Sequence, residues 1–311
     1  MATAQARLTE GGSRFELNQW WRRNQRKIAP YIFVAPFFII FLIFGLYPIV
    51  YSFVLSFYKG FGFEQKTFFG LGNYIHLFQD ARYGKAVLNT TEYAAGSLFI
   101  LSPLALLVAL AINSVYVRWK GLYKTGLFFP VITSGVIIAI IFGRVLDQQY
   151  GLLNILLGWF GIPAVGWLSN APFVMPAYII MGIWTWLGIN ALYWLAGLNG
   201  INKEYYEAAS IDGANQWSSF LYITLPMLRP IMLFVAIQAI IGSYNLFEAP
   251  FLLTQGGPSD ASMTLTLYIY TQGFQNFNVG YASAIAYSMT VLLLVLSLLN
   301  IRLFGWKGAG E

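Results

Sequence analysis

The chain lacks cysteine and has few charged residues. Its 311 residues include no Cys, and Lys, Arg, Asp and Glu together make up 10% of them, whereas 58% are hydrophobic. The missing cysteine excludes disulfides, thiolate metal sites and cysteine nucleophiles. A soluble domain usually carries about 25% charged residues, so the shortfall places the chain in the membrane class.

Common enzyme motifs are missing as well. The sequence has no GxxxxGK[ST] stretch, and therefore no P-loop for a nucleotide, and no serine in a GxSxG motif. The only histidine, His76, has no second histidine and no cysteine near it and is better explained as a surface or interface residue. We expect neither catalysis nor a metal site in this chain. The net charge of +6 does not indicate nucleic acid binding, because Lys and Arg cluster between apolar runs.

Apolar stretches long enough to cross a bilayer dominate the sequence. A hydrocarbon core of about 30 Å needs about 20 helical residues. Prolines in the first stretch predict a kinked or tilted helix, and Pro130, Gly135 and Gly143 predict an irregular third one. The pattern predicts an all-α polytopic membrane protein with spans at about 28–57, 89–112, 122–145, 173–198, 225–249 and 281–304.

The placement of Lys and Arg predicts the orientation, because cytoplasmic loops are enriched in them. With the N-terminus inside, the outer side holds only Lys59, Lys66, Arg82, Lys85 and Arg144. The cytoplasmic side holds Arg7, Arg14, Arg22, Arg23, Arg26, Lys27, Arg118, Lys120, Lys124, Lys203, Arg229, Arg302 and Lys307. We therefore predict a basic cytoplasmic tail at 1–27, one transmembrane domain at 28–305 and a cytoplasmic end at 306–311.

Two acids close to spans are candidate functional residues, since ionisable groups are rare in membranes. Glu92 lies near the outer end of the second predicted span and could simply face water there. In "GSYNLFE", Tyr244, Asn245 and Glu248 fall within about a turn and a half of the fifth predicted helix. Asn245 and Glu248 would then share one face. Such a polar strip should point inward, and a water-facing Glu248 is the alternative.

A short polar segment, the 202–222 loop, separates the fourth and fifth predicted spans. Its sequence "NKEYYEAASIDGANQWSSFLY" predicts a helix over Lys203–Ile211 with Asn202 as its N-cap. Asp212 and Gly213 should end that helix, because glycine adopts backbone angles that other residues resist. A second short helix is predicted over 214–222.

The residue types of this loop favour docking onto a soluble partner. Small side chains would let another protein pack close to the backbone, and acids could pair with basic residues on it. The small residues are Ala208, Ala209 and Ala214, and the acids are Glu204, Glu207 and Asp212. An amphipathic helix on the inner membrane face is the alternative. It predicts Lys and Arg on the polar side, whereas Lys203 is the only base of the first helix.

"EAASIDGANQWSSFLYITLP" (Glu207–Pro226) resembles the cytoplasmic EAA signature of bacterial ABC importer permeases. That signature is Glu-Ala-Ala, three residues, Gly, about nine residues, then Ile-x-Leu-Pro. The matching positions are Glu207, Ala208, Ala209, Gly213, Ile223, Leu225 and Pro226. Four further stretches resemble the carbohydrate-type subfamily, the relatives of the maltose and glycerol-phosphate importers: "GLGNY" (Gly70–Tyr74), "YGLLN" (Tyr150–Asn154), "LLTQGGPSDAS" (Leu252–Ser262) and "GYASAIAY" (Gly280–Tyr287). The large outer domain of one maltose permease subunit is absent.

The resemblance implies a type I ABC importer permease fold with six spans, in a bacterial inner membrane. It implies a non-catalytic subunit that translocates a sugar or oligosaccharide. Its partners would be a second homologous permease subunit in a heterodimer, two cytoplasmic ATPase subunits that bind ATP and Mg, and an extracytoplasmic binding protein. The chain itself would bind no cofactor. The residues expected to couple it to the ATPases are Glu207, Ala208, Ala209, Asp212 and Gly213.

Candidates for the sugar path follow from ligand chemistry, because hydroxyl-rich ligands need aromatic faces and amide groups. They are Trp184, Trp186, Asn190, Tyr193, Gln238, Tyr244, Asn245 and Glu248. In the maltose relatives an Asn-containing stretch before the "GGP" loop lines the sugar site, and Asn245 corresponds to it. Glu248 departs from the apolar residue usual there. The tryptophans could instead serve the interface belt or helix packing.

Three alternatives stay open. An ion-coupled secondary transporter should show internal repeats or buried coupling acids, and no acid lies near a span centre. A membrane-embedded enzyme should show a spaced pair of acids or histidines within the spans, which is absent from the sequence. An ABC permease for another solute, such as glycerol phosphate, would have the same 202–222 loop, so the loop does not distinguish between these substrates.

Overall fold

The computed structural model describes residues 24–60, 66–114 and 117–304. Most of the tail predicted at 1–27 and all of the end predicted at 306–311 lie outside these residues. The chain divides into two compact units, Met1–Leu55 and Ser56–Glu311.

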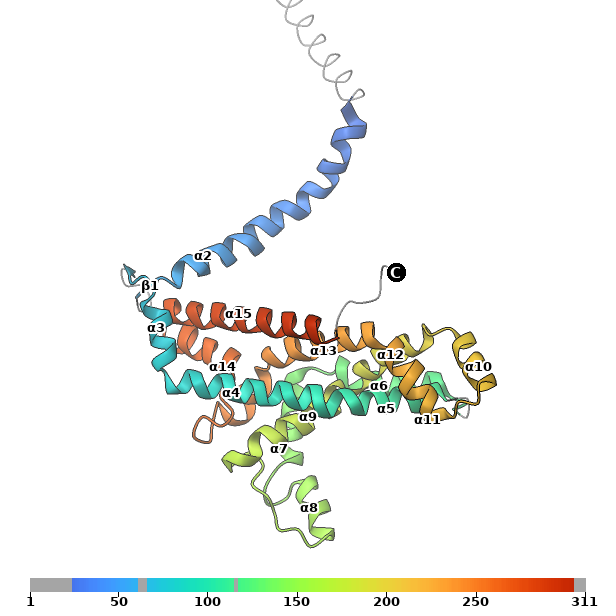
Figure 1. Cartoon of the computed structure of the whole chain (residues 1–311). Helices are drawn as coiled ribbons and strands as arrows, with labels where there is room; N and C mark the ends of the chain where they lie inside the picture. Colours follow the sequence, from blue (N-terminus) through green and yellow to red (C-terminus); the bar gives the residue numbers. More distant parts are fainter. Residues whose placement is uncertain (1–23, 61–65, 115–116, 305–311) are drawn as a thin grey trace, which may run out of the picture. The chain divides into compact units, whose positions relative to one another are not determined.

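The described part of the first unit is one continuous helix, Asn24–Leu55. It includes the π-helical turn η1 (Phe41–Leu46) and α2 (Tyr47–Leu55). This helix curves gradually (Figure 1) and has no sharp kink of the kind that its prolines predicted. The prolines do not interrupt the helix, and the wider π turn comes directly before the tyrosine that precedes Pro48.

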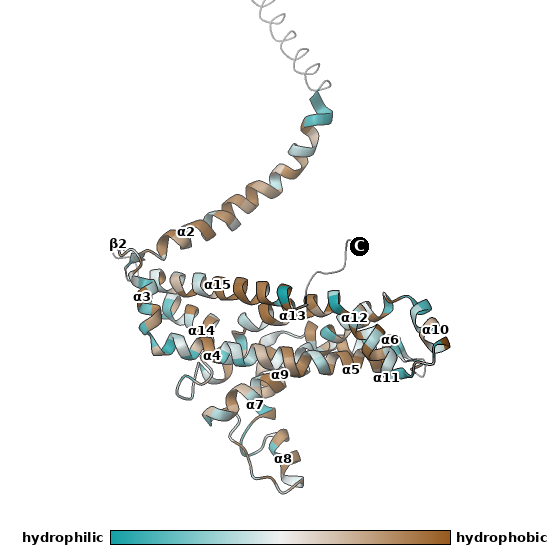
Figure 2. Cartoon of the chain, viewed as in Figure 1, coloured by the Kyte–Doolittle hydropathy of each residue, from teal (hydrophilic) through white to brown (hydrophobic). Residues whose placement is uncertain are grey.

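Three continuous helices of the second unit are long and apolar enough to cross a membrane. They are Ala81–Asn113 (α4, Ala81–Gly96; η2, Ser97–Leu101; α5, Ser102–Asn113), α9 (Ala171–Asn199) and α15 (Val279–Phe304). Figure 2 shows mostly hydrophobic residues in α5 and in the later part of α15, whereas α4 mixes hydrophilic and hydrophobic residues. The sequence placed the corresponding spans at 89–112, 173–198 and 281–304, so the structure extends the first of them by about two turns at its N-terminal end.

The third predicted span, 122–145, consists of two helices. α6 (Lys120–Ile132) and α7 (Gly135–Val145) meet at an angle of 94°. Between them Thr133 and Ser134 have extended backbone angles. The predicted irregularity therefore takes the form of a sharp turn at the break just before Gly135.

The fifth predicted span, 225–249, is also divided. One helix covers Gln216–Met227 (α11, Gln216–Ser219; η3, Phe220–Thr224; α12, Leu225–Met227), and α13 covers Arg229–Tyr244. The two are bent by 65° at the buried Leu228. Pro230 lies in the first turn of α13, where a proline's missing N–H costs nothing. The helix before the bend thus begins in the polar 202–222 loop.

Shorter elements lie around these helices. They are β1 (Tyr58–Lys59), β2 (Thr67–Phe68), α3 (Gly72–Gln79), α8 (Leu152–Trp159), α10 (Lys203–Ile211), η4 (Pro250–Thr254), α14 (Leu265–Tyr270) and η5 (Thr271–Gln275). Tyr58 pairs with Phe68 and Lys59 with Thr67 in the antiparallel ribbon. The predicted all-α class is confirmed, since these two-residue strands are the only sheet in the described part of the chain. Within the second unit, α3 and α14 lie at the opposite end from α10 and α11 (Figure 1).

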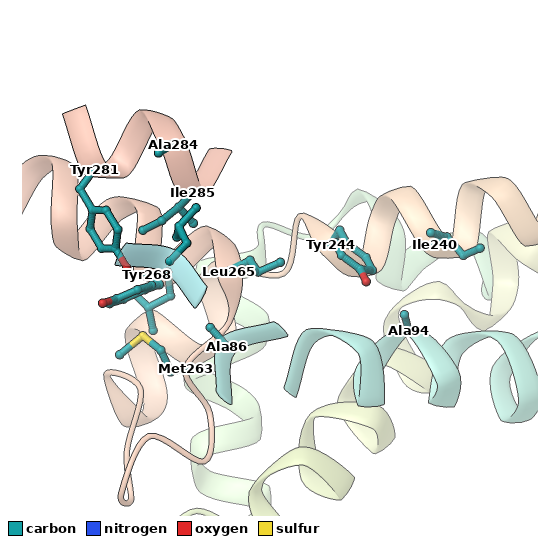
Figure 3. Packing of buried hydrophobic residues seen from close by; sticks show 12 residues of the cluster. Ala86, Ala94, Ile240, Tyr244, Met263, Leu265, Tyr268, Tyr281, Ala284 and Ile285 are labelled. Atoms are coloured by element: carbon teal, nitrogen blue, oxygen red, sulfur yellow. The ribbon is translucent and has the colours of Figure 1, made fainter. Parts of the chain in front are cut away.

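The core depends on small residues that let helices approach. Ala105 and Ala109 of α5 are fully buried and one turn apart, and α9 packs on that face. On α9, a Cβ at Gly188 would collide with the main-chain carbonyl of Leu127 in α6. A second cluster joins α4, α13, α14 and α15 through residues such as Tyr244 (Figure 3).

Candidate functional site

The 202–222 loop begins with α10, which spans Lys203–Ile211 as the sequence predicts. The side chain of Asn202 caps it by accepting a hydrogen bond from the Glu204 N–H (3.1 Å). The Asn202 amide in turn donates to the Glu204 carboxylate (3.0 Å). These contacts satisfy a helix-terminal donor and hold an acid near the positive end of the helix dipole.

A glycine-centred turn ends α10. Gly213 has a φ of +80°, which side-chain-bearing residues rarely adopt. The Ala214 N–H donates to the Ala209 carbonyl (2.9 Å), and the Gly213 N–H donates to that of Ser210 (3.2 Å). The first contact is the six-residue closure of a Schellman motif, which satisfies the last carbonyls of a helix. The loop therefore has a defined shape encoded in its own sequence.

The next helix starts later than predicted. It begins at Gln216, where Asn215 accepts a hydrogen bond from the Ser218 N–H (2.8 Å), and it continues to Met227 rather than stopping at 222. The Tyr206 hydroxyl is hydrogen-bonded to that of Thr224 (2.8 Å). This bond connects α10 to the helix that leads into α13.

The coupling candidates lie mostly on the free surface of this loop. Glu207, Ala208, Asp212 and Gly213 are exposed and Ala209 is half-buried. In the described part of the chain, none of the loop's carboxylates takes part in an ion pair. The loop can therefore offer unpaired negative charge and small side chains to another surface.

Large apolar side chains on the same loop were not singled out from the sequence. Ile211 is 86% exposed and Trp217 66% exposed, and Tyr205 and Tyr222 are exposed as well. The sequence could have indicated this surface, because it contains four large apolar residues within an otherwise polar loop. Together with the acids they form a mixed surface of the kind found at protein interfaces, where aromatic residues are enriched.

A cavity of about 250 Å³ lies between η2, α9 and α13. Four of the predicted sugar-path residues line it: Trp186, Asn190, Tyr193 and Gln238. The volume is slightly below the roughly 300–1,000 Å³ of small-molecule sites. The structure thus brings together one indole ring, one phenol ring and two amides, a set that suits a hydroxyl-rich ligand.

Hydrogen bonds fix part of the cavity wall. The Ser243 hydroxyl is hydrogen-bonded to the Ser97 hydroxyl (3.0 Å) and to the Ala239 carbonyl (2.6 Å). The Asn190 amide donates to the Trp186 carbonyl on its own helix (2.9 Å). The serine pair joins η2 to α13, so the two walls are connected across the cavity edge.

Two aromatic candidates lie elsewhere. The Trp184 ring is 5.6 Å from the Phe142 ring of α7, in agreement with the helix-packing alternative for the tryptophans. Tyr244 is buried in the core with its hydroxyl hydrogen-bonded to that of Thr91 (3.1 Å) (Figure 3). Neither residue lines the 250 Å³ cavity.

The predicted polar strip of Asn245 and Glu248 is wrong. α13 ends at Tyr244, Asn245 is a turn residue, and Leu246 and Phe247 are not helical. The Asn245 amide donates back to the Ile241 carbonyl (2.9 Å). The two side chains are exposed but do not share a helical face.

Hydroxyls from a later segment explain this break. The Thr266 hydroxyl donates to the Tyr244 carbonyl, and the Thr264 hydroxyl donates to the Leu246 carbonyl, both at 2.7 Å. A helix interrupted within a membrane protein leaves carbonyls that must find donors. Because these donors lie about 20 residues further along, the "GSYNLFE" stretch alone could not reveal the break.

Glu248 instead lies where two broken helices meet. Its carboxylate packs against Gly135, the first residue of α7, so closely that a Cβ at position 135 would collide with it. The N-terminal end of a helix favours a negative charge. Glu92, the other acid near a span, is exposed on α4 and forms no ion pair in the described part of the chain.

At the end opposite α10, the side chains of α4 hold the loop that contains "GGPSDAS". Arg82 forms an ion pair with Asp260 (2.9 Å), and Lys85 donates to the Ser259 carbonyl (2.8 Å). Asn89 donates to the Asp260 carbonyl (2.8 Å). The loop is therefore fixed to the second-unit bundle rather than free.

Asp80 connects α4, α14 and α15 at the end of the second unit opposite α10. Its carboxylate accepts hydrogen bonds from the hydroxyls of Tyr268 and Tyr281, at 2.5 Å each, and from the N–H groups of Arg82 and Tyr83. Burial raises the pKa of Asp80, but these four donors together outweigh it and hold the pKa below the ordinary aspartate value.

Comparisons with known proteins agree with this architecture. Residues 101–306 match the family described as "Binding-protein-dependent transport system inner membrane component". The arabinooligosaccharides transport system permease protein AraP of Bacillus subtilis is 40% identical over 288 residues, which cover 92% of this chain and 91% of AraP. The lactose transport system permease protein LacF of Rhizobium radiobacter is 37% identical and covers 87% of this chain and 92% of LacF.

A solved structure has the same fold. It is a bacterial alginate ABC transporter in complex with an alginate pentasaccharide-bound periplasmic protein. One chain of it superposes with a TM-score of 0.79 at 27% sequence identity, and the match covers 93% of this chain and 99% of that one.

Proposed function

Because the chain belongs to the family of binding-protein-dependent transport system inner membrane components, we propose that it is the permease subunit of an ABC importer for a sugar or oligosaccharide. The relatives that match this chain over most of their length are permease proteins of sugar transport systems. We propose that it is non-catalytic itself, and that ATP and Mg are bound by partner subunits.

One observation carries the coupling role that we propose for the 202–222 loop. The loop contains the Glu-Ala-Ala and Gly positions of the EAA signature, whose Ile-x-Leu-Pro end follows directly after it. The loop has a shape fixed by its own caps and exposes Glu207, Ala208, Asp212 and Gly213. A joint that transmits force must keep its shape under load. Caps at both ends of α10 and small exposed side chains provide a rigid surface that another protein can approach closely.

The connection from this loop to the cavity is continuous. Tyr206 is hydrogen-bonded to Thr224, which belongs to the helix Gln216–Met227. That helix passes through the bend at Leu228 into α13, and α13 carries Gln238 on the cavity wall. We infer that a displacement of α10 by an ATPase subunit moves α13 and so changes the cavity.

The cavity supplies one side of the sugar path in this proposal. Trp186 and Tyr193 would stack on sugar rings, while Asn190 and Gln238 would exchange hydrogen bonds with hydroxyls. We place the second, homologous permease subunit opposite this wall. Trp184, Tyr244, Asn245 and Glu248 lie outside this cavity, so we assign them no direct contact with the sugar here.

The remaining partners follow from the same family. We propose two cytoplasmic ATPase subunits beneath the 202–222 loop and an extracytoplasmic binding protein at the opposite end of the second unit. In this orientation both termini lie in the cytoplasm, and the chain crosses the bacterial inner membrane several times.

Replacement of Glu207 tests the coupling role. In proteoliposomes that contain the assembled transporter, Glu207→Lys should leave the protein in the membrane and strongly reduce sugar uptake per ATP hydrolysed. The reason is that a reversed charge on the exposed face of α10 repels the basic partner surface. Uptake and ATP hydrolysis are measured in the same vesicles.

Glu204 provides the matched control. It lies one turn earlier on α10 and is also exposed, but it falls outside the EAA signature and is engaged by Asn202. Glu207→Gln should reduce coupling more than Glu204→Gln does. Equal, wild-type coupling in Glu207→Lys and Glu207→Gln would refute the assignment.

A further inference from the structure

β1 and α3 lie at the end of the second unit opposite the 202–222 loop (Figure 1). Residues of both elements line a second cavity. Its volume is about 530 Å³. We call it the Lys59 pocket and define it by Lys59, Phe69, His76, Gln79, Asn278 and Tyr281. None of these residues belongs to the 250 Å³ cavity or to the coupling loop.

Three polar residues of the pocket lie just outside apolar spans. Lys59 follows the last residue of the helix Asn24–Leu55 by four positions. Gln79 precedes the helix Ala81–Asn113 by two positions, and Asn278 precedes α15 by one. Residues so close to the ends of membrane helices lie at the depth of the lipid headgroups.

The cationic side chain has a fixed place in the pocket. The Lys59 Nζ lies 5.4 Å from the centre of the Phe69 ring, within the range of a cation–π contact. Phe69 can occupy this place because Gly72 has no side chain, and a Cβ there would collide with the ring. Among the described residues no carboxylate pairs with Lys59. Its charge is therefore available to an anion.

The opposite wall is aromatic and rigid. The His76 ring stacks on the Tyr281 ring with 4.9 Å between their centres. The Tyr281 hydroxyl donates to Asp80, so the ring cannot turn away without losing that bond (2.5 Å). Asp80 itself is occupied by four donors. The wall thus offers ring surface and an imidazole rather than an unpaired acid.

The helix that forms one side of the pocket also presents an exposed apolar stripe. Leu71, Ile75 and Phe78 are 61%, 59% and 91% exposed. Their spacing of four and three residues places them along one side of α3 and its N-cap. A short helix with such a stripe beside a polar face is typical of segments that lie in the membrane interface. Acyl chains would cover the stripe while the headgroup reaches the pocket.

We propose that the Lys59 pocket binds the phosphodiester headgroup of an anionic phospholipid. Lys59 supplies the charge for the phosphate, as lysine does in many phosphate sites. Gln79, Asn278 and His76 supply hydrogen bonds to the phosphate and the glycerol hydroxyls. The assignment to the outer leaflet rests on the orientation proposed above, whereas binding of the lipid does not depend on transport.

The test uses the full-length chain, purified with its associated subunits and stripped of lipid. Short-chain phosphatidylglycerol or phosphatidylcholine is titrated in, and bound lipid is counted by native mass spectrometry. We expect phosphatidylglycerol to bind, and Lys59→Gln to weaken its binding about tenfold, as the loss of a hydrogen bond to a charged group does. Lys59→Arg should retain binding.

Lys66→Gln is the matched control, since it removes another lysine, directly before β2, that does not line the pocket. It should bind like the wild type. Unchanged phosphatidylglycerol binding in Lys59→Gln would overturn the proposal, and so would equal binding of phosphatidylcholine to the wild type. Inorganic phosphate or glycerol 1-phosphate that binds as tightly as the lipid would identify a soluble anion and overturn the lipid assignment.

Discussion

The turn that ends α10 and the break that ends α13 are built in different ways. The turn after α10 is closed by Gly213 and by bonds between residues a few positions apart. The break after Tyr244 is held by Thr264 and Thr266, which come about 20 residues later. The first turn is local and exposed, whereas the second is made by tertiary contacts near the cavity. The proposed coupling loop can therefore keep its shape when the bundle moves, while the break depends on how the bundle is packed.

The largest expected effect comes from Thr264→Val, which attacks the tertiary break. Thr264 is fully buried, donates to the Leu246 carbonyl and accepts from the Leu267 N–H as the N-cap of α14. Losing both roles should cost about 2–4 kcal/mol of folding free energy. The melting temperature of the purified protein in detergent should fall by several degrees.

Thr290→Val is the control for that change. The Thr290 hydroxyl bonds only to a carbonyl of its own helix and the residue is exposed. Its replacement should leave the melting temperature within a degree or two. If both variants melt alike, the break at Tyr244 does not depend on the Thr264 hydroxyl.

Gly213→Ala tests the local turn. With a φ of +80° and no neighbour close to the added Cβ, the strain of the left-handed backbone is the only penalty, about 1–2 kcal/mol. Because α10 is a surface element, we expect faster hydrogen exchange in 202–214 with little change in the melting temperature. Gly200→Ala, at an ordinary φ of −82°, should leave exchange in α10 unchanged. A loss of global stability equal to that of Thr264→Val would contradict the distinction between the two turns.

A smaller effect is expected where Glu248 meets α7. Gly135→Ala places a methyl group where the Glu248 carboxylate lies. Since the carboxylate ends a flexible side chain, the cost should be about 1 kcal/mol. Glu248→Ala in the same chain should remove most of that cost, so a double-mutant cycle of melting temperatures should be non-additive. Additive effects would show that the two residues do not meet.

The smallest effect concerns Asp80 and pH. Its pKa is lower when folded than when unfolded, so ionised Asp80 stabilises the fold above the unfolded value of about 4. This contribution disappears as pH falls through the lower folded pKa. The stability difference between wild type and Asp80→Asn should be constant from pH 5 to 7 and shrink in more acidic buffers. A difference that grows on acidification would contradict the hydrogen-bond pattern.

The sequence predicted what local chemistry determines. The all-α class, the helix Lys203–Ile211 and its cap Asn202 follow from apolar run lengths and cap residues. The grouping of Trp186, Asn190, Tyr193 and Gln238 around one cavity was suggested by their chemistry, although α9 and α13 are far apart in the sequence. The 94° bend at Gly135 was anticipated only as an irregularity.

What the sequence could not predict depends on distant contacts. The end of α13 at Tyr244 needs donors from Thr264 and Thr266, and the "GSYNLFE" stretch reads as helix without them. The pocket at Lys59 is formed by β1, α3 and α15, and Tyr281 of α15 is more than 200 positions from Lys59 and Gln79. His76 looked like an isolated histidine because its stacking partner, Tyr281, is 205 positions away.

The most direct test of the coupling role uses the absence of natural cysteine. An Ala208→Cys variant carries a single thiol on the exposed face of α10. Its maleimide labelling rate is measured in the assembled transporter and after the ATPase subunits are removed. We predict slow labelling in the complex and fast labelling of the stripped membrane protein. Equally fast labelling in both states would mean that no motor subunit covers α10 and would contradict the account.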